Sequence, residues 1–170
     1  MEAIIKSHNA KIMREGTVKT DKACNCTIKE ECPFKKQGIS CRATNIIYKA
    51  EVKTATESDF YIGLSEPEFK LRYNNHTSSF NLTRNIKKPT HLATRVRDLK
   101  TRGVKFDIEW SVLKRTSPYT DGDAICSLCL KEATAIMYAD TNCLNKRQEV
   151  MSICKHRKKF LLDNIAGAPD

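Results

Sequence analysis

Two tyrosines, Tyr48 and Tyr61, are followed along the chain by Arg72, His76 and Glu132, and these five side chains are of types that act on phosphates. A positioned phenol or imidazole can take a proton from water, and a guanidinium can stabilise the negative charge of a pentavalent phosphorus. A carboxylate can hold a divalent ion that helps an oxygen to leave. Together they would suit hydrolysis of a phosphodiester, provided that the fold brings them to one place.

The pattern of apolar residues predicts how the tyrosines are positioned. The segments at 45–52 (NIIYKAEV) and 60–64 (FYIGL) have strand character on either side of a polar turn, so a hairpin is expected there. The hairpin would place one phenol on each of two paired strands. A helix is expected next, at 66–80, and within it Arg72 and His76 are four residues apart and share one face.

Apolar spacing also predicts the remaining elements. We expect, in order, a helix at 90–103 that ends at Gly103, a half-buried strand at 104–113, a helix at 124–140 and a basic helix or helix-loop at 145–162. This order predicts a mixed α+β fold, in which a small three-stranded antiparallel sheet is flanked by helices and preceded by a cysteine-rich segment. The expected organisation is a flexible basic leader (1–23), a cysteine-rich segment able to bind zinc (24–44), the folded domain (45–162) and a flexible tail (163–170).

The chain contains 8 cysteines, most of them in two clusters. The first cluster is Cys24, Cys26, Cys32 and Cys41, and the second is Cys126 and Cys129 with Cys154 and His156. Four soft ligands suit tetrahedral zinc that leaves no open position for water, which would make both sites structural. The alternative is that some cysteines, Cys129 in particular, are small buried apolar residues. Cys143 fits neither cluster and is expected to be a free thiol.

A formal net charge of +10 favours binding to a polyanion such as DNA. The candidate phosphate contacts are Lys87, Lys88, Arg95, Arg157, Lys158 and Lys159. Each of these basic segments could equally be a solvated surface that binds nothing. No apolar run reaches the ~20 residues of a membrane-spanning helix, and the charged start of the chain lacks an apolar signal core. We therefore expect an intracellular, nuclear protein with no membrane partner and no small-molecule substrate.

Several motifs, taken in order, resemble one family. The run FYIGLSEPEFKLRYNNH is similar to the YIG half of a GIY-YIG endonuclease, NIIYKAEV stands where the GIY strand would be, and the likeness continues through CSLCLKEATAI and LNKRQEV. The resemblance covers about residues 24–162 and is closest to the GIY-YIG domains of Penelope-like retroelements. It implies a metal-dependent nicking endonuclease that works beside a reverse transcriptase.

The resemblance also implies a role for each matching residue. Tyr48 would activate water, Tyr61 would contact the phosphate, Arg72 would stabilise the transition state and His76 would assist proton transfer. Glu132 would hold one Mg²⁺ or Mn²⁺ ion. Gly63 would allow close backbone approach beside the site, and Asn145 would lie near it, unless Asn145 caps a helix.

Two departures weaken the resemblance. The first motif reads Ile46-Ile47-Tyr48 and lacks the glycine of GIY, and Lys131 stands beside the expected metal ligand. The alternative function is a catalytically inactive, zinc-stabilised module that still binds nucleic acid.

Overall fold

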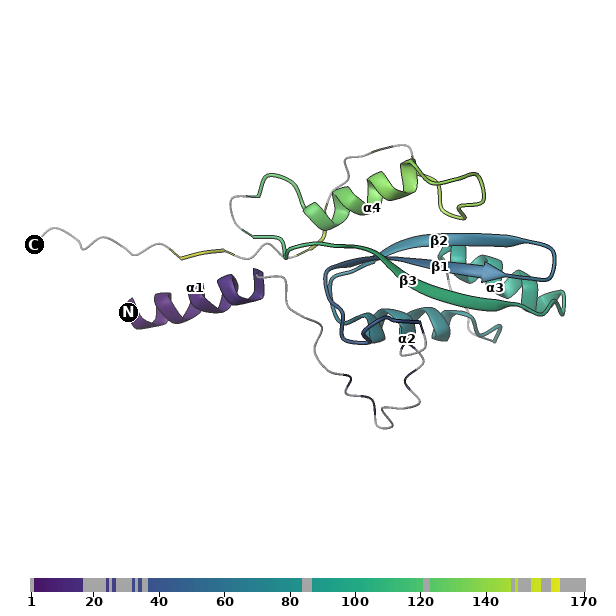
Figure 1. The fold of residues 1–170 in the computed structure, drawn as a ribbon, viewed down its shortest axis with the longest axis horizontal. Coiled ribbons are helices and arrows are strands. Elements are labelled where there is room, and N and C mark those ends of the chain that lie inside the picture. The colour runs from purple at the N-terminus through teal and green to yellow at the C-terminus, as the bar shows by residue number, and fades with distance from the viewer. Residues whose placement is uncertain are drawn as a thin grey trace, which may run out of the picture.

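The chain adopts an α+β fold in which helices flank a three-stranded antiparallel sheet, as the sequence predicts (Figure 1). This computed structural model describes residues 2–16, 24, 26, 32, 34, 37–83, 87–120, 123–147, 149, 154–156 and 160–162. The elements are α1 (Glu2–Gly16), β1 (Ile46–Lys53), β2 (Ser58–Ser65), α2 (Phe69–Ser79), α3 (His91–Thr101), β3 (Asp107–Arg115) and α4 (Ser127–Met137). None of the helices in the described part of the chain has the length and apolar character that crossing a bilayer requires.

Strand β1 lies at the centre of the sheet, in the order β2-β1-β3. It pairs with β2 through a tight connection in which the Thr54 amide donates to the Glu57 carbonyl at 2.9 Å. The antiparallel register sets Tyr48 opposite Gly63 and Ala50 opposite Tyr61. Because side chains alternate between the faces of a strand, Tyr48 and Tyr61 share one face of the sheet.

Both faces of the sheet are covered, and Figure 1 shows α2 and α4 on opposite sides of it. The larger core includes residues of β1, α2 and α3 together with the cysteine-rich segment, among them Phe34, Cys41, Ile46, Tyr48, Phe69, Leu92, Val96 and Trp110. The smaller core lies beneath α4 and includes Ile47, Phe60, Ile62, Leu128 and Ile136. Successive residues of β1 and β2 therefore serve different cores, and this explains the apolar run Ile46, Ile47 and Tyr48 in β1, whereas Lys49, Glu51 and Lys53 later in the strand are only half-buried.

Helix α3 shows how local sequence sets an element's ends. The Thr90 hydroxyl accepts a hydrogen bond from the Ala93 amide at 3.2 Å and caps the first turn. Beyond the last turn Gly103 has φ +67°, a left-handed conformation that favours glycine, and this confirms the expected stop.

Two other elements are shorter than the sequence predicts. Strand β3 begins at Asp107 instead of residue 104, and α4 runs from Ser127 to Met137 instead of over 124–140. Apolar periodicity marks the buried face of an element but does not mark where its hydrogen bonds end.

A helix, α1, occupies most of the segment expected to be a basic leader. It contacts the C-terminal segment, since the Asn9 amide donates to the Leu162 carbonyl at 2.7 Å and the Leu162 amide donates to Asn9 Oδ1 at 2.8 Å. The described residues of 145–162 are not helical, and the rest of that expected helix or helix-loop lies outside the described residues. The tail at 163–170 also lies outside them.

Candidate active site and metal centres

A short hydrogen-bonded chain links three of the expected site residues. Tyr48 is fully buried on β1, and its hydroxyl oxygen accepts a bond from Arg72 Nε at 3.2 Å. The same hydroxyl lies 2.6 Å from His76 Nε2. Arg72 and His76 come from one face of α2, one turn apart, as their spacing predicts.

His76 is held neutral, so its Nε2 can accept a proton. Burial, reinforced by the charge of Arg72, lowers the pKa of His76 from 6.5 to about 4. The Tyr48 oxygen accepts from Arg72, and in the tautomer of neutral His76 that carries its proton on Nδ1 the phenol donates to Nε2. Burial raises the pKa of Tyr48, and Arg72 opposes this increase.

Tyr61 joins the group from the neighbouring strand β2. Its ring centroid lies 6.4 Å from that of Tyr48, and its hydroxyl also hydrogen-bonds to the Arg72 side chain. Burial raises the pKa of Tyr61, with Arg72 again opposing the increase. Arg72 therefore connects the two phenols, which the paired strands hold on one face.

Gly63 has a more specific role than the expected close backbone approach. A Cβ atom on Gly63 would collide with the Tyr48 hydroxyl and would lie 2.6 Å from Tyr48 Cζ and 2.8 Å from Tyr61 Cε1. The missing side chain leaves the space into which both phenol rings fit. Ile46 stands where the GIY motif has its glycine. Its side chain is fully buried in the larger core, so this position has room for a side chain, unlike residue 63.

An aromatic cluster supports the Tyr48–His76 contact. The ring of Trp110 on β3 lies 5.8 Å from Tyr48 and 5.6 Å from His76, centroid to centroid. Phe69 and Tyr73, on α2, both pack against Phe34 of the cysteine-rich segment. Strand alternation predicts that Trp110 points inward, but no sequence signal predicts that it lies against the histidine.

Glu132 is placed on α4 near the same group, and it has an ion-pair partner that the sequence analysis missed. Its Oε2 lies 3.1 Å from Nη1 of Arg147. Burial raises the pKa of Glu132, while the charges of Arg147 and Arg72 lower it. Lys131 does not compete for the carboxylate, since its Nζ donates to the carbonyl of Arg115 at 3.3 Å.

Asn145 neither caps a helix nor contacts the phenols, and instead it supports β2. Its side-chain Oδ1 accepts a bond from the Ile62 amide at 3.1 Å, and its Nδ2 donates to the Ile62 carbonyl at 2.7 Å. The carboxamide thus takes the place of a peptide group from a neighbouring strand. Ile62 lies between Tyr61 and Gly63, so Asn145 helps to fix the strand segment that carries the site.

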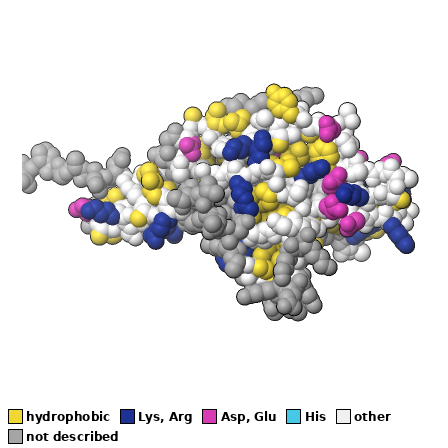
Figure 2. Space-filling model, in the orientation of Figure 1, with side chains coloured by type: hydrophobic (Ala, Val, Ile, Leu, Met, Phe, Trp, Pro, Cys, Tyr) yellow, Lys and Arg dark blue, Asp and Glu magenta, His cyan; other side chains and the backbone are white. Residues whose placement is uncertain are grey.

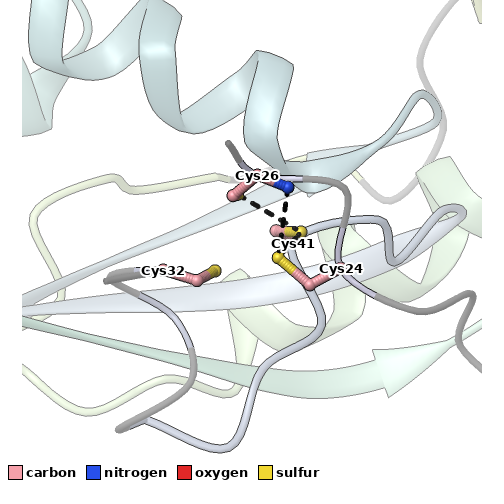
Figure 3. A group of neighbouring side chains, drawn as sticks. All are labelled: Cys24, Cys26, Cys32 and Cys41. Atoms are coloured by element: carbon pink, nitrogen blue, oxygen red, sulfur yellow. Dashed lines mark hydrogen bonds between the residues drawn. The ribbon is translucent and has the colours of Figure 1, made fainter. Parts of the chain in front are cut away.

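The first cysteine cluster forms a candidate metal centre beside α2. The ligand atoms of Cys24, Cys26, Cys32 and Cys41 lie within 4.8 Å of one another. Cys41 Sγ is 3.5 Å from Cys24 Sγ and 4.0 Å from Cys26 Sγ, where ideal tetrahedral zinc would hold its sulfurs about 3.8 Å apart. Figure 3 shows the side chains of Cys24 and Cys41 adjacent, with those of Cys26 and Cys32 nearby.

The second cluster forms another candidate centre, at the start of α4. Its four ligand atoms also lie within 4.8 Å of one another, and they belong to Cys126, Cys129, Cys154 and His156. Nδ1 of His156 is 3.3 Å from the sulfurs of both Cys129 and Cys154, and 3.5 Å from that of Cys126. The expectation that these residues form one group is therefore confirmed, and Cys129 is not simply a packing residue. Cys143 is buried outside both clusters as a free thiol.

Each centre adjoins the beginning of a helix that carries site residues. The Cys41 carbonyl accepts a bond from the Lys70 amide at 2.8 Å in the first turn of α2. Cys126 is the N-cap residue of α4. A cluster of thiolates carries negative charge, which is favourable at the positive end of a helix dipole. The two helices that bear Arg72, His76 and Glu132 are thus each anchored at their first turn.

The expected phosphate contacts occupy different surroundings. Lys87 and Lys88 are exposed, and Figure 2 shows Lys and Arg side chains at several separate places on one face of the molecule. Arg95 is instead engaged with two carboxylates, since its Nη2 lies 2.6 Å from Glu57 Oε2 and 2.7 Å from Asp59 Oδ2. It ties α3 to the hairpin, and its role as a phosphate contact stays a prediction. The remaining three, Arg157, Lys158 and Lys159, lie outside the described residues.

Comparison with known proteins does not assign the chain to a family: no protein-family model, no curated protein and no solved structure matches it.

Proposed function

We propose that the chain is a metal-dependent DNA endonuclease of the GIY-YIG type that nicks one strand. The observation that carries the proposal is the contact of Arg72 and His76 with Tyr48, with Tyr61 bonded to the same arginine. The group contains a proton acceptor, two phenols and a fixed positive charge, and Glu132 lies close enough for Arg72 to influence it.

The proton path follows from the hydrogen bonds. Tyr48 takes a proton from the attacking water as it passes its own proton to the neutral Nε2 of His76, which becomes an imidazolium. The resulting hydroxide attacks phosphorus, and the bond to the leaving oxygen breaks. A histidine with a pKa of about 4 is ready to accept at neutral pH, since nearly all of it is unprotonated.

The charges needed during cleavage come from other members of the site. Arg72 stabilises the extra negative charge of the pentavalent phosphate, and Tyr61 donates a hydrogen bond to a phosphate oxygen. Glu132 offers the kind of oxygen ligand that Mg²⁺ or Mn²⁺ takes together with water and substrate phosphates, although Arg147 competes for it in the DNA-free protein. Glu132 would hold this ion, which when bound supplies Lewis-acid stabilisation of the phosphate and the leaving oxygen.

The remaining parts of the proposal concern zinc and the biological setting. Zn²⁺ in both cysteine clusters fixes α2 and α4, and with four protein ligands each it plays no part in the chemistry. The excess of basic residues supports DNA as the partner. In the setting of a mobile element the nick exposes a 3′ end for a reverse transcriptase in the nucleus.

A plasmid-nicking assay tests the proposal. Supercoiled plasmid is incubated with Mg²⁺ or Mn²⁺ and the wild-type chain, Tyr48→Phe, Glu132→Ala or the control Tyr73→Phe. Tyr73 lies on α2, and its ring packs against the rings of Phe34 and Trp110, so its hydroxyl should be dispensable. We expect the first two variants to nick more slowly by about 10²-fold or more, and the control to stay within about threefold of wild type.

The alternative is an inactive DNA-binding module, and the Glu132–Arg147 ion pair is the feature that favours it. A wild-type chain that binds plasmid but never nicks it would support that alternative. Equal nicking by Glu132→Ala would show that the carboxylate has no part in the reaction.

A further inference from the structure

Arg147 is placed where it must affect any ion that Glu132 binds. The two side chains are only 23% and 16% exposed, and Nη1 lies 3.1 Å from Oε2. Arg72 adds a second positive charge that acts on the same carboxylate. A single carboxylate with two guanidinium neighbours is a poor site for a free divalent cation, because the three cations repel one another.

The backbone just before Arg147 is anchored, because the Asn145 side chain is hydrogen-bonded to Ile62 of β2. Arg147 itself also donates from Nε to the Glu149 carbonyl at 3.1 Å. An arginine side chain has several rotatable bonds, so its guanidinium can change partners by rotation about them.

We propose that Arg147 is a positioning residue that exchanges partners, pairing with Glu132 in the DNA-free protein and with a DNA backbone phosphate once a divalent ion occupies the carboxylate. The inference rests on the proposed function. A divalent ion repels Arg147 from Glu132, and a nearby phosphate offers the charged oxygens that a guanidinium binds best. Ion and DNA then bind cooperatively, because each favours the same position of Arg147.

This exchange makes two predictions, and the second separates it from a purely structural ion pair. Without Arg147 the carboxylate is free, so Arg147→Gln should bind Mn²⁺ more tightly than wild type. In the wild type without an ion, Arg147 is held by Glu132 and adds little to DNA affinity. Arg147→Gln should therefore weaken DNA binding only when an ion is present.

The experiment uses the zinc-loaded full chain and two measurements. Mn²⁺ binding without DNA is followed by the electron paramagnetic resonance signal of free Mn²⁺. Binding of a fluorescent DNA duplex is followed by anisotropy, with and without Ca²⁺. The variants are Arg147→Gln, the charge-preserving Arg147→Lys, and Glu132→Gln, which should abolish the Mn²⁺ site.

We expect Arg147→Gln to bind Mn²⁺ about tenfold more tightly than wild type, and to bind the duplex about tenfold more weakly in Ca²⁺ but equally well without it. Arg147→Lys should behave nearly as wild type in both measurements. Unchanged Mn²⁺ affinity in Arg147→Gln, or equal loss of duplex affinity with and without Ca²⁺, would overturn the exchange. Circular dichroism and zinc content show that each variant is folded.

Failure of this inference can be told from failure of the proposed function. If the wild type nicks plasmid and depends on Glu132, but Arg147→Gln binds Mn²⁺ as the wild type does, only the exchange is wrong. If nicking never occurs while both affinity changes appear, the exchange of partners by Arg147 is supported and the proposed phosphodiester hydrolysis is wrong.

Discussion

At the scale of single residues, Tyr48 and Gly63 face one another across the β1–β2 ladder, and the fit is tight. The phenol of Tyr48 lies where a side chain on residue 63 would be, and Tyr61 closes the same space from the other side. The glycine is needed for room and not for an unusual backbone conformation. The hairpin and α2 that carry this cluster are adjacent in sequence, and their apolar pattern predicts them, whereas the convergence of the side chains was expected only from the resemblance to GIY-YIG domains.

Gly63→Ala should lower both stability and activity. The added methyl group displaces the Tyr48 ring, so we expect a loss of about 1–3 kcal/mol in the free energy of unfolding and little remaining nicking. Ser65→Ala is the matched control, since Ser65 is buried two residues further along β2 and its hydroxyl donates to the Pro67 carbonyl at 2.9 Å. Urea unfolding measures both, and a Gly63→Ala chain as stable and active as wild type would contradict the steric argument.

His76 makes stability depend on pH. Its pKa is lowered from 6.5 to about 4 in the fold, so between these values the unfolded chain binds a proton that the folded chain does not. The contribution of the neutral imidazole is fully present above pH 6.5, and it is lost as the pH falls toward 4, by roughly 3 kcal/mol in all.

Urea unfolding at several pH values tests this against His76→Gln, whose amide does not titrate. We expect the wild type to lose stability more steeply than the variant as the pH falls from 6.5. Loss of metal at low pH affects both chains alike and cancels in the difference. Parallel curves would mean that folding does not lower the pKa of His76.

At the scale of elements, the outer edge of β2 is covered by a segment that is not itself a strand of the sheet. The Phe60 amide donates to the Asn142 carbonyl at 3.1 Å, and the Leu144 amide donates to the Phe60 carbonyl at 2.7 Å. Asn145 continues this pairing with its carboxamide. Edge coverage of this kind protects a strand from pairing with other chains.

Asn145→Ala should be distinctly destabilising. It removes both bonds to Ile62 and leaves a buried amide and carbonyl without partners, which costs about 2–3 kcal/mol. The matched control is Asn142→Ala, which removes one exposed bond to the Ser58 carbonyl and should cost under about 1 kcal/mol. Thermal unfolding compares the two variants. Similar melting temperatures would show that the Asn145 carboxamide does not act in place of a peptide group from a neighbouring strand.

The arrangement of the elements also shows which parts of the site could not be predicted from the sequence. Apolar periodicity predicts strands and helices because each element needs a buried face. The roles of Asn145 and Arg147 depend on partners far away in the chain, Ile62 and Glu132, and no local pattern encodes such a pair. The ion pairs of Arg95 were unpredictable for the same reason, since a helix sequence does not reveal whether carboxylates of a distant hairpin reach its basic residues.

At the scale of the whole molecule, two cysteine-rich groups lie at the starts of α2 and α4, the helices that Figure 1 shows on opposite sides of one small sheet. The first draws the cysteine-rich segment against α2, and the second joins the C-terminal segment to α4. Both groups were predictable, because thiolate spacing is a strong local signal. Their position at the helix starts was not, because it depends on how the connecting segments return to the sheet.

Zinc analysis of the purified chain should find two ions. We expect one ion in Cys24→Ser/Cys41→Ser and one in Cys126→Ser/Cys129→Ser, while the control Cys143→Ser keeps two, because Cys143 lies outside both groups. The loss of either ion should lower the melting temperature, since structural zinc contributes directly to folding. Fewer than one zinc in the wild type would exclude both centres.

The order of these parts along the chain has a consequence for synthesis. The tyrosine hairpin and α2 are complete by Ser79, whereas β3, α4 and Arg147 follow later, and β1 pairs with β3 across a long separation. Non-local strand pairing forms slowly, and a chain emerging from the ribosome meets its early segments first. A nascent or truncated polypeptide therefore possesses the phenols, the guanidinium and the imidazole before it possesses Glu132, and the set is complete only once α4 has been made.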